Sequence, residues 1–378
     1  MAIPVSSSSR EREVESTTIN CWTWSIRPLI IWLRFLGVAL PDVSTSSSLC
    51  HRWVMLAHGI LCFSSHATGH IDILCYLFTK SEPGSLEQAG GSNYDTTTAK
   101  MNSIIDFVNY TVNGFGTHII MLTVIRTRWI RLRNSFQRLE GVFVEENYIR
   151  IRNMSSMGVV SIILLIFGLT ASSTGYHFAV GTSSTHRIFI SFMATISIIY
   201  PLTALVLFFT HCYASSLAFE SIQTEVKRNE IQLMNGREQD VSQLIFLFKE
   251  RHILANETVD GINDSFGCYL LLATTSYFVS IINSTFYLFG LDNRISLPDI
   301  IFTLFVLFNL TVTCFAADSI QNKMNTFISE MAHTIPQISA NGYFDVSRKL
   351  FPQVIGTTLT YFFILCQFEV SEKKLCPK

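Results

Sequence analysis

The chain has 378 residues, of which 49% are hydrophobic and only 15% are charged, with a formal net charge of −1. Soluble domains carry about 25% charged residues, so this composition predicts a polytopic membrane protein. The near-neutral charge argues against a nucleic-acid partner. Nine cysteines form no C-x-x-C pair, so neither a disulfide framework nor a metal site is expected.

Residues 1–50 are predicted to form a polar tail that contains a short helix at about 26–37. This segment includes Arg27 and Arg34, and it is too short to span a bilayer, which needs about 20 apolar residues. Two interpretations stay open: an amphipathic helix lying at the inner interface, or a hydrophobic anchor packed on the first span.

Seven apolar segments are each long enough to cross the bilayer as a helix. They are 54–78, 102–125, 157–180, 188–212, 266–290, 298–317 and 352–369. The first segment is unusually polar and holds His66 and His70 at a helical spacing of four residues. A polar face turned towards a cavity inside the bundle explains this pattern better than a metal site, which needs more ligands.

Basic residues indicate the orientation of the spans. The segments before span one and between spans two and three, four and five, and six and seven hold 5, 7, 5 and 3 Lys or Arg residues, twenty of the 27 in the chain. The positive-inside rule therefore predicts a cytoplasmic N-terminus and, with seven spans, an extracellular tail at 370–378.

The connections on the cytoplasmic side are long and carry apolar residues at helical spacing. Between 213 and 264, and again after the sixth span, this pattern predicts helical extensions of the spans. They would pack into an intracellular domain or remain solvated amphipathic linkers; the number of large apolar residues favours the packed domain. The expected organisation is a six-helix transmembrane bundle at 51–317, intracellular anchor helices at 318–350 and a last span at 351–369.

Motifs that carry enzymatic chemistry are missing from the sequence. It contains no Gly-rich phosphate loop, no G-x-S-x-G and no H-E-x-x-H, so we expect no catalytic residues, no cofactor and no enzyme activity. A receptor or channel with a small-molecule pocket in the outer half of the bundle fits best; a G-protein-coupled receptor and a membrane transporter are the alternatives.

Polar and aromatic residues in the outer halves of the spans are the candidates for this pocket, because aromatic walls with a few polar groups are typical of small-molecule sites. The candidates are Asp106, Asn109, Tyr110, Asn113, Ser173, Tyr176, Ser191, Thr195, Asn283, Tyr287 and Phe302.

The C-terminal span contains the most specific pattern in the chain. Thr360-Tyr361 is followed by five hydrophobic residues and then Gln367-Phe368, and Gly342-x-Phe344-Asp345 with Arg348 precedes the span. This pattern resembles the seventh-helix signature of the insect gustatory receptors, which are related to the insect odorant receptors. Asn263-x-x-Phe266-Gly267 also resembles that family.

The resemblance implies a homotetrameric, ligand-gated cation channel, or a heteromer with related receptors, in the plasma membrane of chemosensory neurons. Its seventh helices would line a central pore through Thr360, Tyr361, Ile364, Gln367 and Phe368. Gly342, Phe344, Asp345 and Arg348 would lie in the intracellular anchor.

The implied ligand is a small-molecule tastant. Sugar receptors of this family often have an acidic residue directly after the Thr-Tyr pair, where this chain has Phe362. A bitter or otherwise aversive compound is therefore expected, with a sugar-responsive receptor as the alternative.

Overall fold

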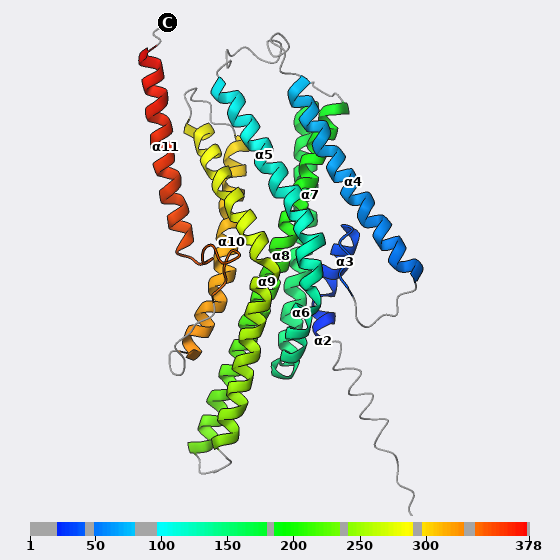
Figure 1. Ribbon diagram of the computed structural model, residues 1–378, viewed down its shortest axis with the longest axis vertical. Coiled ribbons are helices and arrows are strands. Elements are labelled where there is room, and N and C mark those ends of the chain that lie inside the picture. The colour runs from blue at the N-terminus through cyan, green and yellow to red at the C-terminus, as the bar shows by residue number, and fades with distance from the viewer. Residues whose placement is uncertain are drawn as a thin grey trace, which may run out of the picture.

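Long helices run side by side through the molecule, with α11 at one edge and α4 at the other (Figure 1). The structure is a computed structural model that describes residues 21–41, 49–79, 97–179, 185–234, 241–289, 297–328 and 337–375. The helices in these residues are α2 (Cys21–Ser25), α3 (Arg27–Phe35), α4 (Leu49–Thr79), α5 (Thr97–Ile120), η1 (Met121–Ile125), α6 (Arg126–Arg138), η2 (Leu139–Val142), α7 (Glu145–Ala179), α8 (Thr185–Met234), α9 (Val241–Phe289), α10 (Leu297–Ile328) and α11 (Leu350–Leu375).

Each of the seven predicted spans forms a helix. Four of them contain stretches long and apolar enough to cross a membrane, judged by length and composition over the described residues: Glu145–Ala171, Ser197–Asn229, Lys249–Thr285 and Ile300–Lys323. These belong to α7, α8, α9 and α10 and correspond to the third to sixth predicted spans. That α4, α5 and α11 also cross the membrane, and that the N-terminus is cytoplasmic, stay predictions.

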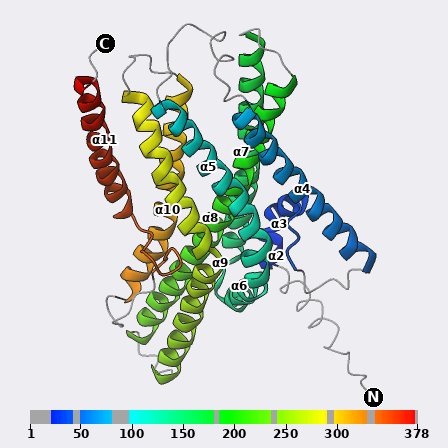
Figure 2. The same cartoon turned by 45° about the horizontal axis from the view of Figure 1, so that its top comes forward.

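The predicted helical extensions are present. α8 and α9 have 50 and 49 residues, about 75 Å each at 1.5 Å per residue, against about 30 Å of hydrocarbon. They project together beyond the rest of the bundle (Figure 2). Near the bundle their apolar residues pack, since Phe219 and Ile222 are buried, whereas Phe246 farther along is exposed. The extension is thus packed at its base and solvated in part beyond it.

Helix α8 forms the centre of the core. His211 is fully buried there, with the rings of Trp22, Trp129, Phe136 and Phe266 within 6 Å of its ring. Its Nδ1 lies 2.7 Å from the backbone oxygen of Leu207 on the same helix. This aromatic cluster joins α2, α6, α8 and α9, so the parts of the chain before and after the first spans share one core.

The N-terminal helix was expected either at the inner interface or packed on the first span, whereas it packs mainly against α7. That it lies at the inner interface stays a prediction. Leu29, Trp32 and Leu33 of α3 are buried, and the Trp32 indole donates a 3.0 Å hydrogen bond to Thr203 of α8. Ile31 and Phe35 remain exposed on the other face. The helix ends at Phe35, and Gly37, two residues later, has a φ of +80°, in the left-handed region that glycine adopts without strain.

Two C-terminal predictions need correction. The expected anchor helices at 318–350 are helical only as far as Ile328 among the described residues, because 337–349 folds as a hairpin. The expected tail at 370–378 continues α11 as far as Leu375. Glu372, Lys373 and Lys374 are good helix formers and extend the helix beyond its apolar run.

Candidate functional site

A cavity of about 50 Å³ lies between α5, α8, α9 and α10. Because a buried water needs about 10–15 Å³ of such space, it can hold about three to five waters. None of the lining residues in the described part of the chain carries a charge. The polar and aromatic side chains of the wall are Asn109, Tyr110, Asn113, Ser197, Tyr277, Ser280, Phe302, Phe305 and Asn309.

The cavity lies where α5 closely approaches a proline in α8. Pro201 has no N–H, so the Ser197 carbonyl four residues earlier loses its helical donor. Gly114 of α5 meets this carbonyl, and a Cβ added at Gly114 would lie 2.8 Å from the Ser197 oxygen. A side chain at 114 would therefore push the two helices apart beside the cavity.

Several polar groups of the wall are already hydrogen bonded. The Asn109 amide donates to the Ser276 carbonyl at 3.1 Å and to the Ser280 hydroxyl at 2.8 Å, which uses both of its N–H bonds. The Tyr277 hydroxyl is hydrogen bonded to Tyr269 and Thr313. Tyr269 in turn donates to the Pro201 carbonyl at 3.0 Å, so the wall is tied to the α8 proline.

Asn113 differs from these residues. Its side-chain oxygen Oδ1 is buried and has no hydrogen-bond partner in the structure. A buried acceptor without a donor is costly, and native proteins rarely keep one without a reason. Aromatic side chains lie on the same wall, where the Tyr110 and Phe302 rings stack 6.0 Å apart.

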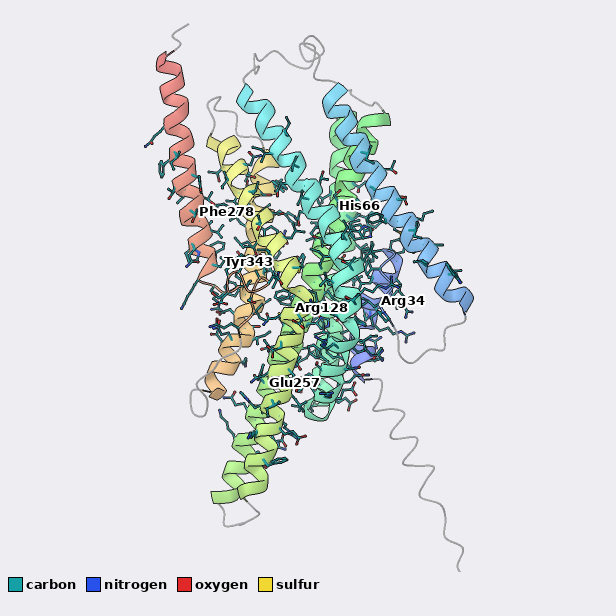
Figure 3. The ribbon with its side chains drawn as sticks, viewed as in Figure 1. Arg34, His66, Arg128, Glu257, Phe278 and Tyr343 are labelled. Atoms are coloured by element: carbon teal, nitrogen blue, oxygen red, sulfur yellow. The ribbon has the colours of Figure 1, made fainter. Side chains whose placement is uncertain are left out.

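Two buried histidines adjoin the cavity. His66 of α4, labelled in Figure 3, has its Nδ1 3.2 Å from the Nδ1 of His118 on α5, and its Nε2 is 3.4 Å from the Ser197 hydroxyl. The Tyr200 ring stacks on His118 at 3.8 Å. This contact accounts for His66 of the first span, whereas Ser64, Ser65 and Thr68 are exposed and the His70 side chain lies outside the described ones. The described residues hold no group of three or more metal-ligating side chains.

The two faces of α11 differ sharply. Val354 and Thr358 are buried against the bundle, and the Tyr361 ring meets Phe278 of α9 edge-on at 6.3 Å. Beside this packed face runs an exposed stripe at helical spacing of three and four residues. This stripe, hereafter the α11 stripe, consists of Gln353, Thr357, Thr360, Ile364 and Gln367.

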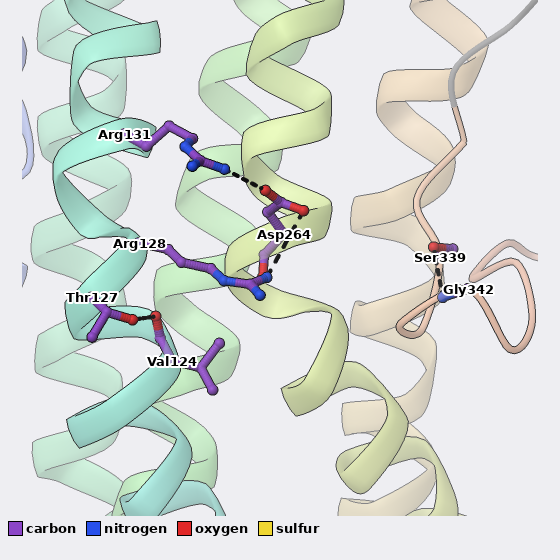
Figure 4. Close-up of polar contacts among 7 residues, drawn as sticks. All are labelled: Val124, Thr127, Arg128, Arg131, Asp264, Ser339 and Gly342. Carbon is purple, nitrogen blue, oxygen red and sulfur yellow. Dashed lines mark hydrogen bonds and ion pairs between the residues drawn. The ribbon is translucent and has the colours of Figure 1, made fainter.

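The hairpin before α11 is built on an Asn-Gly turn. Asn341 and Gly342 have φ of 53° and 79°, and the Tyr343 N–H donates to the Ala340 carbonyl at 3.0 Å, as in a type I′ turn. Ser339 and Asp345 pair as an antiparallel bridge, and the Gly342 N–H donates to the Ser339 hydroxyl (Figure 4).

The hairpin is clamped to α9 and α10. Asn263 of α9 donates to the Gln337 carbonyl at 2.7 Å and accepts from the Ser339 N–H at 3.0 Å. A Cβ added at Gly267 would lie 3.0 Å from the Asn341 nitrogen, so a glycine is needed for this approach. Arg348 forms a 2.8 Å ion pair with Asp318 of α10.

The same part of α9 is bound to α6 from its other side. Arg131 forms a 3.0 Å ion pair with the Asp264 carboxylate, and Arg128 contacts both that carboxylate and the Asp264 carbonyl (Figure 4). Two turns away, Arg138 pairs with Glu257 at 3.2 Å. These partners are exposed, so each pair contributes about 1 kcal/mol or less. Together they hold α9 between the basic helix and the hairpin.

Comparison with known proteins agrees with this arrangement. Residues 313–372, which cover the end of α10, the hairpin and most of α11, match the family described as the 7tm chemosensory receptors. Over this segment the chain is similar to the chemosensory receptors. No curated protein sequence matches the chain.

Solved structures share the fold of this chain. The insect olfactory receptor OR5 from Machilis hrabei superposes with a TM-score of 0.68 and 13% identity, over 91% of this chain and 97% of that one. The same receptor in complex with eugenol gives a TM-score of 0.60 and 13% identity, over 93% and 99% of the two chains. At this identity the likeness shows the fold.

The structure brings together some of the residues that the sequence predicted for a pocket. Asn109, Tyr110, Asn113 and Phe302 line the cavity, whereas Asn283 is buried in α9 and is not part of the wall. The side chains of the other expected pocket residues lie outside the described ones; they are Asp106, Ser173, Tyr176, Ser191, Thr195 and Tyr287.

Other wall residues were not predicted. Asn309 lies in the inner half of its predicted span, whereas Ser197, Ser280 and Phe305 lie in the outer halves and were not chosen as candidates. Helical spacing could have indicated two of them, because 302, 305 and 309 share a face with one another. Pro201 could have indicated the depth of the cavity, since a proline inside a span leaves backbone groups to satisfy.

The residues predicted for the pore lie on α11, and those predicted for the anchor lie in the hairpin before it. Thr360, Ile364 and Gln367 belong to the α11 stripe, whereas Tyr361 contacts α9, which corresponds to a brace rather than a pore lining. The Phe368 side chain lies outside the described ones. The expected anchor residues Gly342, Phe344, Asp345 and Arg348 all lie in the hairpin.

Proposed function

We propose that the chain is a gustatory receptor that acts as a ligand-gated, non-selective cation channel in the plasma membrane of chemosensory neurons. The α11 stripe carries the proposal. The stripe exposes the amide residues Gln353 and Gln367 and the hydroxyl residues Thr357 and Thr360, whose hydroxyls also donate to carbonyls of their own helix. Polar side chains within membrane spans almost always face the interior of a bundle or a water-filled cavity rather than lipid.

Four copies arranged around the α11 stripe would place these groups on a central pore, as the gustatory-receptor signature implies. The fold shared with an insect olfactory receptor supports this assignment over a G-protein-coupled receptor or a transporter. Its eugenol complex supports the binding of small molecules by proteins of this fold. A heteromer with a related receptor would use the same stripe.

The agonist is proposed to be a bitter or otherwise aversive compound that binds in the cavity. Phe362 in place of an acidic residue argues against a sugar, and so does an uncharged wall with aromatic side chains. To move a closed-to-open ratio from 1:99 to 99:1, agonist must favour the open state by about 5.5 kcal/mol. Shared by four sites, this is about 1.4 kcal/mol per site.

Cysteine accessibility tests the pore assignment. Thr357→Cys and Thr360→Cys lie on the α11 stripe, and Thr358→Cys, on the buried face, is the matched control. In cells that express each variant, a charged thiol reagent should reduce tastant-evoked current for the two stripe variants and leave the control and the unsubstituted chain unaffected. Equal block of all variants, or of none, would contradict a pore along this stripe.

A further inference from the structure

Among the described wall residues, one fully buried side-chain oxygen has no hydrogen-bond partner. Asn113 Oδ1 is buried and has no donor, although Asn109, one turn away on α5, has both amide N–H bonds satisfied. The contrast is between two residues of the same type on the same wall. Asn109 joins α5 to α9, whereas Asn113 joins nothing through its oxygen.

The rest of the wall limits what could meet this oxygen. The Tyr277 hydroxyl is engaged by Tyr269 and Thr313, and Tyr110, Phe302 and Phe305 supply ring surfaces. No side chain of the described wall is charged. A charged ligand would therefore lose its hydration without gaining a counter-charge there.

We propose that Asn113 is the specificity-determining residue of this cavity, and that its Oδ1 accepts a hydrogen bond from a small, neutral, ring-containing ligand with one hydroxyl or N–H donor. This rests on the proposed function only in taking the cavity as the agonist site. The ring packs between the aromatic side chains, and the donor of the ligand satisfies the acceptor that the protein leaves unpaired.

Size supports a ligand of about one ring. The cavity has room for only a few waters as it stands, so a molecule with a six-membered ring enters when Tyr110 and Phe302 move apart. A ligand with many hydroxyls, such as a sugar, would bring more polar groups than the wall can satisfy. A ligand with no donor would leave Oδ1 buried and unpaired.

The test uses the full-length chain in lipid nanodiscs and measures binding rather than current. Phenol, which is neutral at pH 7 because phenols titrate near pH 10, is compared with anisole, the same ring with its donor methylated. Each is titrated while the unfolding midpoint is recorded, since a ligand raises the midpoint according to its Kd. Benzylammonium serves as the cationic probe.

Phenol should bind about tenfold more tightly than anisole, which corresponds to about 1.4 kcal/mol. In Asn113→Leu, of similar size and without the acceptor, the ratio should fall to about one while anisole binding is kept. Asn153→Leu, at an exposed position on α7, should keep the tenfold ratio. If Asn113→Leu does not fold, the phenol-to-anisole ratio of the unsubstituted chain still decides the proposal.

Equal affinity for phenol and anisole, a preference for benzylammonium, or no binding of any probe would overturn the proposal. The result is separable from the proposed function. Phenol binding that depends on Asn113, without any current in cells, would support the ligand class and contradict the channel. A tastant-evoked current with equal phenol and anisole binding would support the channel and contradict the ligand class.

Discussion

Substitution of Asn263 tests the attachment of the hairpin to α9 most directly, because this one side chain forms both hydrogen bonds from α9 to the hairpin backbone. Its amide donates to the Gln337 carbonyl, and its oxygen accepts from the Ser339 N–H. Each such bond contributes about 1 kcal/mol net. Asn263→Ala should therefore make detachment of the hairpin easier by about 2 kcal/mol, which raises the detached population about 30-fold.

Limited trypsin digestion measures the population of molecules whose hairpin is detached. Arg348 and Lys349 are exposed at the end of the hairpin, and cleavage after them requires local opening when reclosing is fast. In nanodiscs, the rate at which mass spectrometry detects fragments cut after these residues should rise about 30-fold in Asn263→Ala.

Two variants sharpen the result. Asn263→Asp keeps the acceptor for Ser339 but places a carboxylate oxygen against the Gln337 carbonyl, so it should not restore the slow rate. Asn153→Ala, exposed on α7, should cleave as slowly as the unsubstituted chain. A cleavage rate in Asn263→Ala equal to that of Asn153→Ala would refute the clamp.

Two further predictions concern the N-terminal segment. Burial raises the pKa of the Glu140 carboxyl, while the Trp22 N–H and Arg133 lower it less. Because a raised pKa means that the folded state holds the proton more tightly, stability should fall as pH rises from about 4.5 through the raised pKa. Glu140→Gln should flatten this slope of unfolding midpoint against pH; an unchanged slope would assign it to other groups. Trp22 is fully buried and its ring stacks on Phe136 at 4.2 Å, so Trp22→Ala should cost about 3–5 kcal/mol. Trp24→Ala, at a 40% exposed position beside Arg152, should cost about 1 kcal/mol, and equal losses of unfolding midpoint in the two variants would contradict this packing.

The long helices could be predicted because their cause is local. An apolar run must form its hydrogen bonds within the segment, and the charged continuations of α8 and α9 keep a helical apolar period. The hairpin was predicted as helix although Asn341-Gly342 is a strong turn signal. The prediction followed the apolar residues that recur at helical spacing in the sequence after the sixth span, and it gave the turn signal too little weight.

Contacts between distant segments account for most of what the sequence did not reveal about the site. His66 and His118 are 52 residues apart and meet only because α4 and α5 pack at that height. Asn109, Tyr110 and Asn113 of α5 and Phe302 of α10 were predicted from the polar and aromatic character of their spans. The part that α8 contributes depends on the close approach at Gly114, which is a property of two helices together.

The position of α9 has a mechanical consequence. This helix has 49 residues and no proline, and it carries Tyr277 of the cavity wall 14 residues from the clamp residue Asn263, about 21 Å along its axis. If α9 pivots about Asn263, a 1 Å outward displacement of Tyr277 corresponds to a tilt of α9 by about 3°. The same tilt moves Phe278 and therefore its contact with Tyr361 on α11. A change in the width of the cavity and a shift of the contact between α9 and α11 are thus produced by the same rigid-body tilt of α9.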